Sequence, residues 1–149
     1  GVSFMDLEVD VPVGKVKIRK VYCLQDSGKI INPQLAEGQM HGGVAMGIGY
    51  ALGEQMLFDA ATGRPLNNNL LDYKIPTCMD IPDMEIRFVE THEDSAPFGA
   101  KGLAEPPLIP QAAAVRNAIL HATGVGMHKL PMNPQNLVHA FGEAGLIAQ

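Results

Sequence analysis

The sequence contains no tryptophan, few aromatic residues and only two cysteines. Aromatic residues make up 5% of the 149 residues. The cysteines, Cys23 and Cys78, are far apart in the chain and no CxxC pair occurs. This spacing excludes the ligand pattern of a zinc site or an iron–sulfur cluster. We therefore expect two reduced, buried thiols and no metal ion bound directly by the chain.

Clustered positive charge and long apolar runs are also missing. The chain has 11 Lys and Arg against 16 Asp and Glu, and its formal net charge is −5. Because nucleic acids are recognised through clustered positive charge, we expect no nucleic-acid partner. No run of about 18 uncharged apolar residues and no signal-peptide pattern is found. We expect no membrane partner and a cytoplasmic location.

The length and the first residues bear on domain organisation. A chain of 149 residues fits one domain with one sizeable core. The sequence begins at Gly1 without an initiator Met and enters strand-like residues almost at once. We therefore expect residues 1–149 to form a single domain that is a fragment of a longer subunit.

The periodicity of apolar residues predicts an α+β fold. Residues 9–31 are rich in Val and Ile and alternate with polar residues, which predicts a hairpin or meander with turns at Gly14 and residues 26–28. Residues 84–90 also alternate and predict a strand, as does a short apolar patch at residues 56–59. Helices are predicted over residues 33–55, from about 110 to 122, and after Asn133 to about 141.

The helix expected over residues 33–55 has an unusual composition. Its interior is rich in glycine, and each glycine costs up to about 1 kcal/mol relative to alanine in a helix. A compensating reason is therefore needed, either tight packing against another backbone or the close approach of a flat ligand. The residues alone leave both open. The glycines concerned are Gly38, Gly42, Gly43, Gly47 and Gly49.

A single acid, Glu105, lies directly before two prolines. A residue before proline is driven toward an extended backbone, and Pro106 and Pro107 each fix φ and lack an N–H donor. Glu105 is therefore expected to be held rigidly. Lys101 lies just before it in a glycine-rich segment, which makes an ammonium and backbone amides available to an anion. The spacing alone also fits an acid that stabilises a helix N-terminus.

Several blocks of the sequence resemble one protein family. The block Lys101-Gly102-Leu103-Ala104-Glu105-Pro106-Pro107 resembles the Lys-Gly-x-Gly-Glu-Pro-Pro segment of the molybdenum-binding large subunits of the xanthine dehydrogenase and aldehyde oxidase family. Residues 31–49, 69–77 and 122–131 contain further similar blocks in the same order. The string from Leu71 to Thr77 is most similar to bacterial xanthine dehydrogenases. The resemblance falls on the C-terminal part of these longer subunits.

The resemblance implies a fold, cofactors and partners. The fold would be the C-terminal portion of a molybdopterin-binding domain, with the cofactor close to the glycine-rich helix. The cofactor would be molybdopterin, usually the cytosine dinucleotide form in bacteria, and it would hold the molybdenum. Iron–sulfur (2Fe–2S) and FAD groups would lie on partner subunits or domains, and the rest of the molybdenum subunit would be a further partner.

The resemblance also implies roles for individual residues. Glu105 would be the general base in the oxidative hydroxylation of a purine, xanthine or hypoxanthine, at a carbon next to a ring nitrogen. Gln39 would contact the cofactor. Ala104 departs from the family, which has glycine there, and an alanine would be strained if the backbone needed a positive φ. The residues that would line the cofactor beside Glu105 are Lys101, Gly102, Leu103 and Ala104.

Two other functions fit the same residues. The chemistry would also suit an aldehyde or another N-heterocycle such as nicotinate, because the residues that select the substrate lie outside this sequence. Alternatively, the chain is a non-catalytic fragment or assembly domain, in which Glu105 only stabilises a helix. We expect the intact subunit to be a xanthine dehydrogenase-type molybdenum oxidoreductase, and the isolated chain to be inactive.

Overall fold

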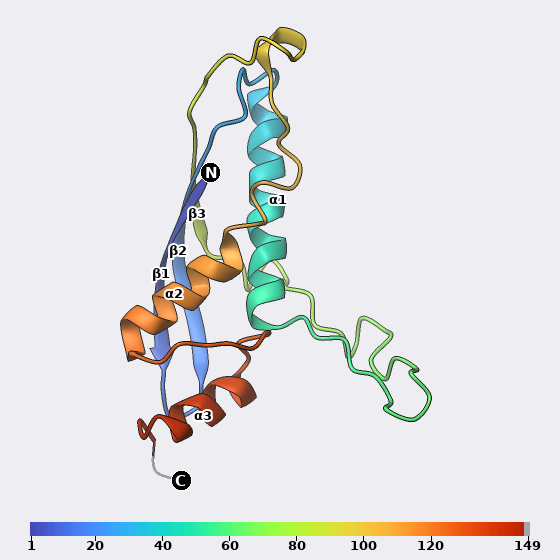
Figure 1. The fold of residues 1–149 in the computed structure, drawn as a ribbon, viewed down its shortest axis with the longest axis vertical. Helices are drawn as coiled ribbons and strands as arrows, with labels where there is room; N and C mark the ends of the chain where they lie inside the picture. The colour runs from blue at the N-terminus through green and yellow to red at the C-terminus, as the bar shows by residue number, and fades with distance from the viewer. Residues whose placement is uncertain (148–149) are drawn as a thin grey trace.

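The computed structural model describes residues 1–147, which form a mixed three-stranded sheet with helices packed on it (Figure 1). Strands β1 (Val2–Asp10) and β2 (Lys15–Gln25) are antiparallel, and β3 (Asp83–Phe88) pairs with β2 in parallel. The helices are α1 (Pro33–Leu52), α2 (Gln111–Thr123) and α3 (Pro134–Glu143), with a short 3-10 helix η1 (Pro97–Gly99). The predicted α+β class is confirmed.

The β1–β2 hairpin packs one face toward the helices and exposes the other. Its inward-facing residues on β2 change from even to odd numbers, with Ile18 before the change and Val21 after it. The cause is a register shift, because Asp6 pairs with Lys20 but the next residue pairs with Ile18, so Arg19 is an extra residue. An extra residue in a strand reverses the face on which every later side chain lies.

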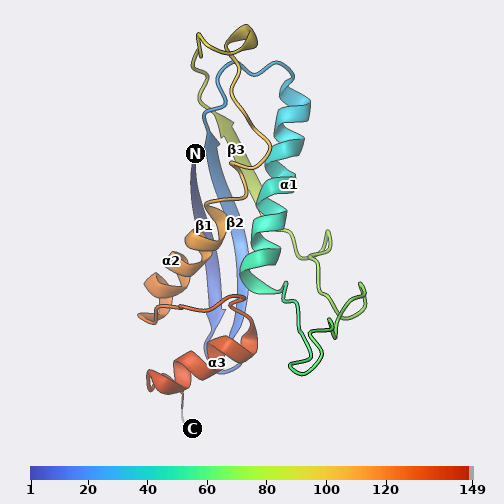
Figure 2. The same ribbon diagram turned by 45° about the vertical axis from the view of Figure 1, so that its right-hand side comes forward.

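Helices α1 and α2 cover the same face of the sheet and contact each other (Figures 1 and 2). The chain passes from β2 through α1 and residues 53–82 to reach β3, the long crossover that a parallel strand pair requires. Residues 53–82 project away from the sheet before they return (Figure 1). Helix α3 lies at the hairpin end, where a Cβ on Gly14 would be 2.6 Å from the Pro134 carbonyl oxygen.

Local capping explains where two of the helices begin. The Asn32 side chain accepts a hydrogen bond from the Leu35 amide, and Pro33 follows it in the first turn. Asn133 does the same for α3 through the Asn136 amide. Helix α1 ends before Gly53, earlier than the predicted boundary at residue 55.

No helix in residues 1–147 is long and apolar enough to cross a membrane. The cytoplasmic location stays a prediction.

The predicted strand over residues 56–59 is wrong. Phe58 makes an isolated bridge with Pro65, and no strand of the sheet formed by residues 1–147 pairs with it. The turn is organised instead by the side chain of Asn67, which accepts from the Leu57 amide at 2.8 Å and donates to the Gln55 carbonyl at 2.6 Å. Met56, Leu57 and Phe58 remain exposed, so the apolar patch did not mark a strand of the sheet.

The glycines of α1 divide into two groups. A Cβ on Gly43 would be 2.7 Å from the Pro107 Cβ, and one on Gly47 would be 2.5 Å from the Gln111 Cβ, so these glycines let the chain after Glu105 pack directly on α1. Nothing in residues 1–147 lies within 4 Å of a Cβ built on Gly38 or Gly42. Tight packing, and not ligand approach alone, is therefore one reason for the glycines.

Candidate functional site

The segment before Glu105 is tied to the turn after β2. Ala100 forms an antiparallel bridge with Gly28, and the Lys101 amide donates to the Ser27 carbonyl at 2.8 Å. The Lys29 amide donates to the Gly99 carbonyl at 2.9 Å. These bonds join residues far apart in the sequence and give the loop a fixed starting point beside α1.

The side chain of Asp26 gathers several donors at this point. Its carboxylate accepts from the Gly28 amide at 2.9 Å, the Lys101 ammonium at 2.9 Å and the Thr91 hydroxyl at 2.8 Å. The Gly28 amide, then Lys101 and Thr91, lower the pKa of Asp26 to about 2. The Lys101 ammonium is therefore paired with Asp26. We had expected it to be available to an anion. Sequence analysis assigned residues 26–28 only to a turn and missed this role.

Residues predicted to bind the cofactor surround one small groove. The groove has a volume of about 330 Å³, and Gln39, Lys101, Leu103 and Ala104 all line it. Its remaining wall is largely apolar and includes Leu35 of α1. Gln39 is exposed, and its amide donates to the Ala104 carbonyl at 3.5 Å, a long hydrogen bond. The structure thus brings together α1 and the loop before Glu105.

Glu105 and Gly102 lie in the same loop but not in the groove wall. Both are exposed. The Glu105 carbonyl accepts from the Leu108 amide at 2.9 Å, which closes a turn. Because α2 begins only at Gln111, Glu105 lies outside its first turn, and the structure does not favour the alternative in which this acid stabilises a helix N-terminus.

The alanine that departs from the family pattern fits its position. Among the non-glycine residues in 1–147, only Phe98 has a positive φ, at 57°. Ala104 therefore does not need the conformation that favours glycine, and the expected strain is absent. Its methyl group lies on an exposed residue that lines the groove.

The donors of this loop suit a molybdopterin. No hydrogen bond to another residue in the described part of the chain is found for the amides of residues 102–105. The Gln39 side-chain amide lies beside them. Phosphate and pterin groups are rich in hydrogen-bond acceptors, and a run of free backbone N–H groups is a suitable partner for them. The residues present therefore fit one wall of a molybdopterin site.

The two thiols differ in their surroundings. Cys23 is buried in the sheet, and burial raises the pKa of its thiol, which keeps it neutral and unreactive. Cys78 is exposed, so its expected burial is wrong. The reason is that Cys78 lies in the projecting residues 53–82, outside the core. Residues 1–147 contain no group of three or more His, Cys, Asp and Glu side chains placed to hold a metal ion.

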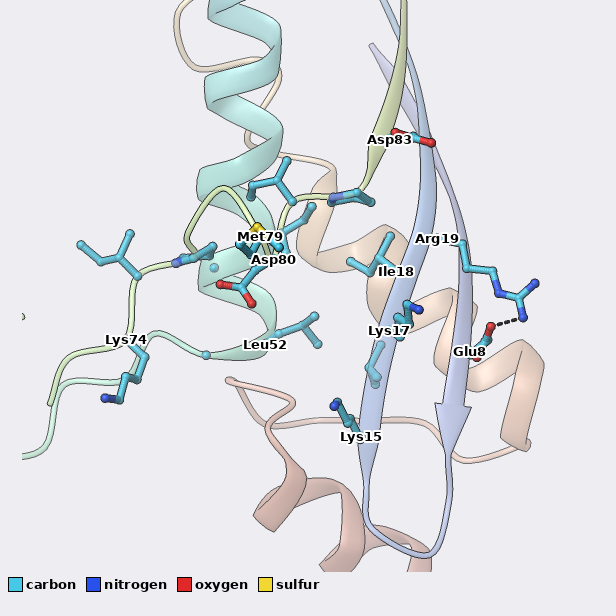
Figure 3. A pocket seen from close by; sticks show the side chains of 18 residues that line it. Glu8, Lys15, Lys17, Ile18, Arg19, Leu52, Lys74, Met79, Asp80 and Asp83 are labelled. Atoms are coloured by element: carbon cyan, nitrogen blue, oxygen red, sulfur yellow. Dashed lines mark ion pairs between the residues drawn. The ribbon is translucent and has the colours of Figure 1, made fainter. Parts of the chain in front are cut away.

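A larger cavity of about 960 Å³ lies elsewhere, between the hairpin, the end of α1 and residues 74–83 (Figure 3). Figure 3 shows Lys15 and Lys17 on one side and Lys74 and Asp80 on the other. None of the predicted site residues lines it, and its charges are mixed. The volume of this cavity does not by itself indicate a function, so the smaller groove is the candidate site.

Comparison with known proteins gives the family of the chain. The pattern of the molybdopterin cofactor-binding domain family matches residues 1–82. The chain is 52% identical to the xanthine dehydrogenase molybdenum-binding subunit of Escherichia coli O157:H7, over 99% of this chain and 20% of that subunit. It is 42% identical to the nicotine 6-hydroxylase large subunit of Paenarthrobacter nicotinovorans, over 90% of this chain and 17% of that subunit.

The solved structures agree with the fold. The crystal structure of the Cu,Mo-CO dehydrogenase in its carbon monoxide reduced state superposes with a TM-score of 0.89 at 31% identity, over 97% of this chain and 18% of that chain. The chain thus spans about a fifth of the length of its relatives. The chain belongs to the molybdopterin cofactor-binding domain family and is homologous to part of the molybdenum-binding subunits of xanthine dehydrogenases.

Proposed function

We propose that this chain forms one wall of the molybdenum site in a hydroxylase and supplies its general base, Glu105. The observation that carries the proposal is the groove in which Gln39, Lys101, Leu103 and Ala104 meet directly before Glu105. Gln39 and the free amides of the loop would hold the cofactor. Gly102 would permit its close approach, since a Cβ there meets nothing within 4 Å.

When bound, the molybdenum cofactor supplies the oxidising power for a hydroxylation that removes two electrons from the substrate. The chain's own task is to move a proton. The exposed carboxylate of Glu105, on a rigid Pro-Pro segment, can take a proton from the attacking oxygen. The rest of the subunit would cover the site and exclude water from it. The two prolines keep the carboxylate in one place, which matters because a misplacement of about 1 Å can cost about 100-fold in rate.

We propose a purine, xanthine or hypoxanthine, as the substrate. The support is the higher identity to a xanthine dehydrogenase subunit than to a nicotine 6-hydroxylase subunit. An aldehyde or another N-heterocycle is the alternative substrate, because the chain is also similar to subunits of a nicotine 6-hydroxylase and an aldehyde oxidoreductase. The cytosine dinucleotide form of molybdopterin, and 2Fe–2S and FAD groups on partner chains, complete the proposal.

We also propose that residues 1–149 act as one domain at the C-terminal end of a longer molybdenum subunit, and that the rest of this subunit is its main partner. The outer face of α1 supports this, because it is apolar and exposed at Leu35, Met46 and Tyr50. The isolated chain would supply only part of the site and would be inactive.

The test is Glu105→Gln in the complete, cofactor-loaded protein. We expect kcat for xanthine to fall by about 100-fold to 10,000-fold, because the amide cannot accept the proton. Molybdenum per protein should be unchanged. The control is Glu143→Gln, which removes an exposed carboxylate from α3, far from the groove, and should leave kcat unaltered.

Retained turnover in Glu105→Gln would reject the general base. Turnover of benzaldehyde or nicotinate, but not of xanthine, would reject the purine and keep the chemistry. A fully loaded protein that oxidises none of these compounds would favour a non-catalytic assembly role.

A further inference from the structure

The most deeply buried polar side chain near Glu105 is that of Gln111, at the start of α2. Its exposed fraction is 0%. The Gln111 Oε1 accepts from the Ser3 hydroxyl at 2.8 Å, and its Nε2 lies 2.6 Å from the Pro107 carbonyl and 3.9 Å from the Cys23 Sγ. Every polar atom of the amide therefore has a partner on another part of the fold.

The bond to Pro107 fixes the segment that carries Glu105. Pro106 and Pro107 have no N–H groups, so this segment has few donors with which to anchor itself. The Gln111 side chain provides a donor, which binds the Pro107 carbonyl. The Gln111 backbone amide donates to the Leu108 carbonyl at 3.2 Å. Leu108 in turn donates to the Glu105 carbonyl at 2.9 Å. Gln111 thus holds the turn at two points.

The same contacts attach this turn to the sheet and to α1. Pro107 is buried and packs on Gly43, while Gln111 packs on Gly47. Ser3 and Cys23 lie on β1 and β2, so the amide spans from the sheet to the loop. The turn that carries the exposed carboxylate of Glu105 is therefore attached to the core through the buried amide of Gln111.

We propose that Gln111 is a positioning residue, whose buried amide holds the Pro107 carbonyl and so fixes the orientation of Glu105 in the molybdenum site. The inference rests on the proposed function of Glu105. Gln111 does not touch the groove, so it acts on the reaction only through the turn that it anchors.

The first test is Gln111→Met in the complete, cofactor-loaded protein, because methionine has a similar volume and cannot donate to Pro107. We expect kcat for xanthine to fall about 10-fold to 100-fold, since the base is no longer held in line. KM and molybdenum content should stay within about twofold, because the substrate and cofactor contacts are intact.

The control is Asn136→Leu, which removes the same kind of bond elsewhere. The Asn136 side-chain amide donates to the Pro131 carbonyl at 2.7 Å, remote from the groove. Both variants should lower the melting temperature, but only Gln111→Met should lower kcat. A purely structural role predicts the same kinetic behaviour for both.

The second test is hydrogen exchange of the Leu108 amide, measured with and without cofactor. We expect this amide to be protected in the unmodified protein and to exchange at least about tenfold faster in Gln111→Met, while the β1–β2 amides stay unchanged. If Gln111→Met does not fold, Gln111→Asn is used, because its amide is one methylene too short to reach Pro107.

Two results would overturn the inference. The first is a kcat of Gln111→Met within about twofold of the unmodified protein. The second, which needs no variant, is a Leu108 amide that exchanges at the unprotected rate in the unmodified protein. Failure of the general-base proposal has a different signature, because Glu105→Gln would then retain turnover whatever the exchange at Leu108 shows.

Discussion

At the scale of single residues, the loop of the site depends on one carboxylate that sequence analysis did not select. Asp26 binds the Gly28 amide, the Lys101 ammonium and the Thr91 hydroxyl. All three donors favour the ionised form, which is why the pKa of Asp26 is lowered to about 2. A group whose pKa is lowered by folding stabilises the fold above its unfolded pKa, about 3.9 for Asp, and loses that contribution as the pH falls toward the folded value.

We therefore predict that Asp26→Asn lowers the melting temperature at neutral pH, and that this difference from the unmodified protein shrinks between about pH 4 and pH 2. Thermal unfolding followed by circular dichroism over that range measures it. Asp94→Asn is the control, because the Asp94 side chain is fully exposed and its one ion pair within residues 1–147 is with His92 at 3.5 Å. A difference that is independent of pH would contradict the assignment.

At the scale of elements, the glycines of α1 show how one helix carries two kinds of surface. Gly43 and Gly47 face Pro107 and Gln111 at distances that leave no room for a side chain. Gly38 and Gly42 face open space. An alanine gains about 1 kcal/mol over glycine in a helix interior, but overpacking in a filled site costs about 1–3 kcal/mol. The two pairs should therefore respond to the same substitution with opposite signs.

We predict that Gly43→Ala and Gly47→Ala lower the free energy of unfolding by up to about 2 kcal/mol, the net of overpacking and propensity. Gly38→Ala and Gly42→Ala should raise it by up to about 1 kcal/mol. Urea denaturation of the four variants measures the sign directly. Equal stabilisation by all four would mean that α1 does not pack closely on the segment after Glu105.

At the scale of the whole molecule, α1 carries large apolar side chains both in the core and on its exposed side. One side contributes Met40 and Val44 to the core, whereas Leu35 on the other side is 71% exposed. Large apolar side chains that lie exposed together on one surface often mark an interaction site. The exposed face adjoins the groove, since Leu35 lines both. This agrees with our proposal that the rest of a molybdenum subunit packs here.

We predict that the chain purified alone associates with itself through this face, and that Leu35→Lys combined with Met46→Lys shifts it toward the monomer, because charged side chains oppose burial. Sedimentation velocity at several concentrations measures this. The control is Gln34→Lys combined with Glu37→Lys, which changes exposed polar positions of the same helix. Similar behaviour of the two double variants would exclude the apolar face as the cause.

The sequence by itself determined the features that depend on neighbouring residues. Asn32 and Asn133 begin their helices because a cap acts on amides within one turn. Alternation located β2 and β3, but the hairpin predicted over residues 9–31 was placed too late in the chain, because β1 already begins at Val2 and β2 ends at Gln25. The same local reasoning failed at residues 56–59, where a short apolar patch forms only the isolated bridge between Phe58 and Pro65.

Tertiary structure decided everything that depends on distant contacts. The partner of Lys101 is Asp26, far away in the sequence, and the amide of Gln111 reaches Ser3 and Cys23 on two strands. No local pattern marks these pairs, because a buried hydrogen bond is defined by geometry and not by spacing. Packing also decided which glycines of α1 lie against the chain, Gly43 and Gly47, and which face open space, Gly38 and Gly42.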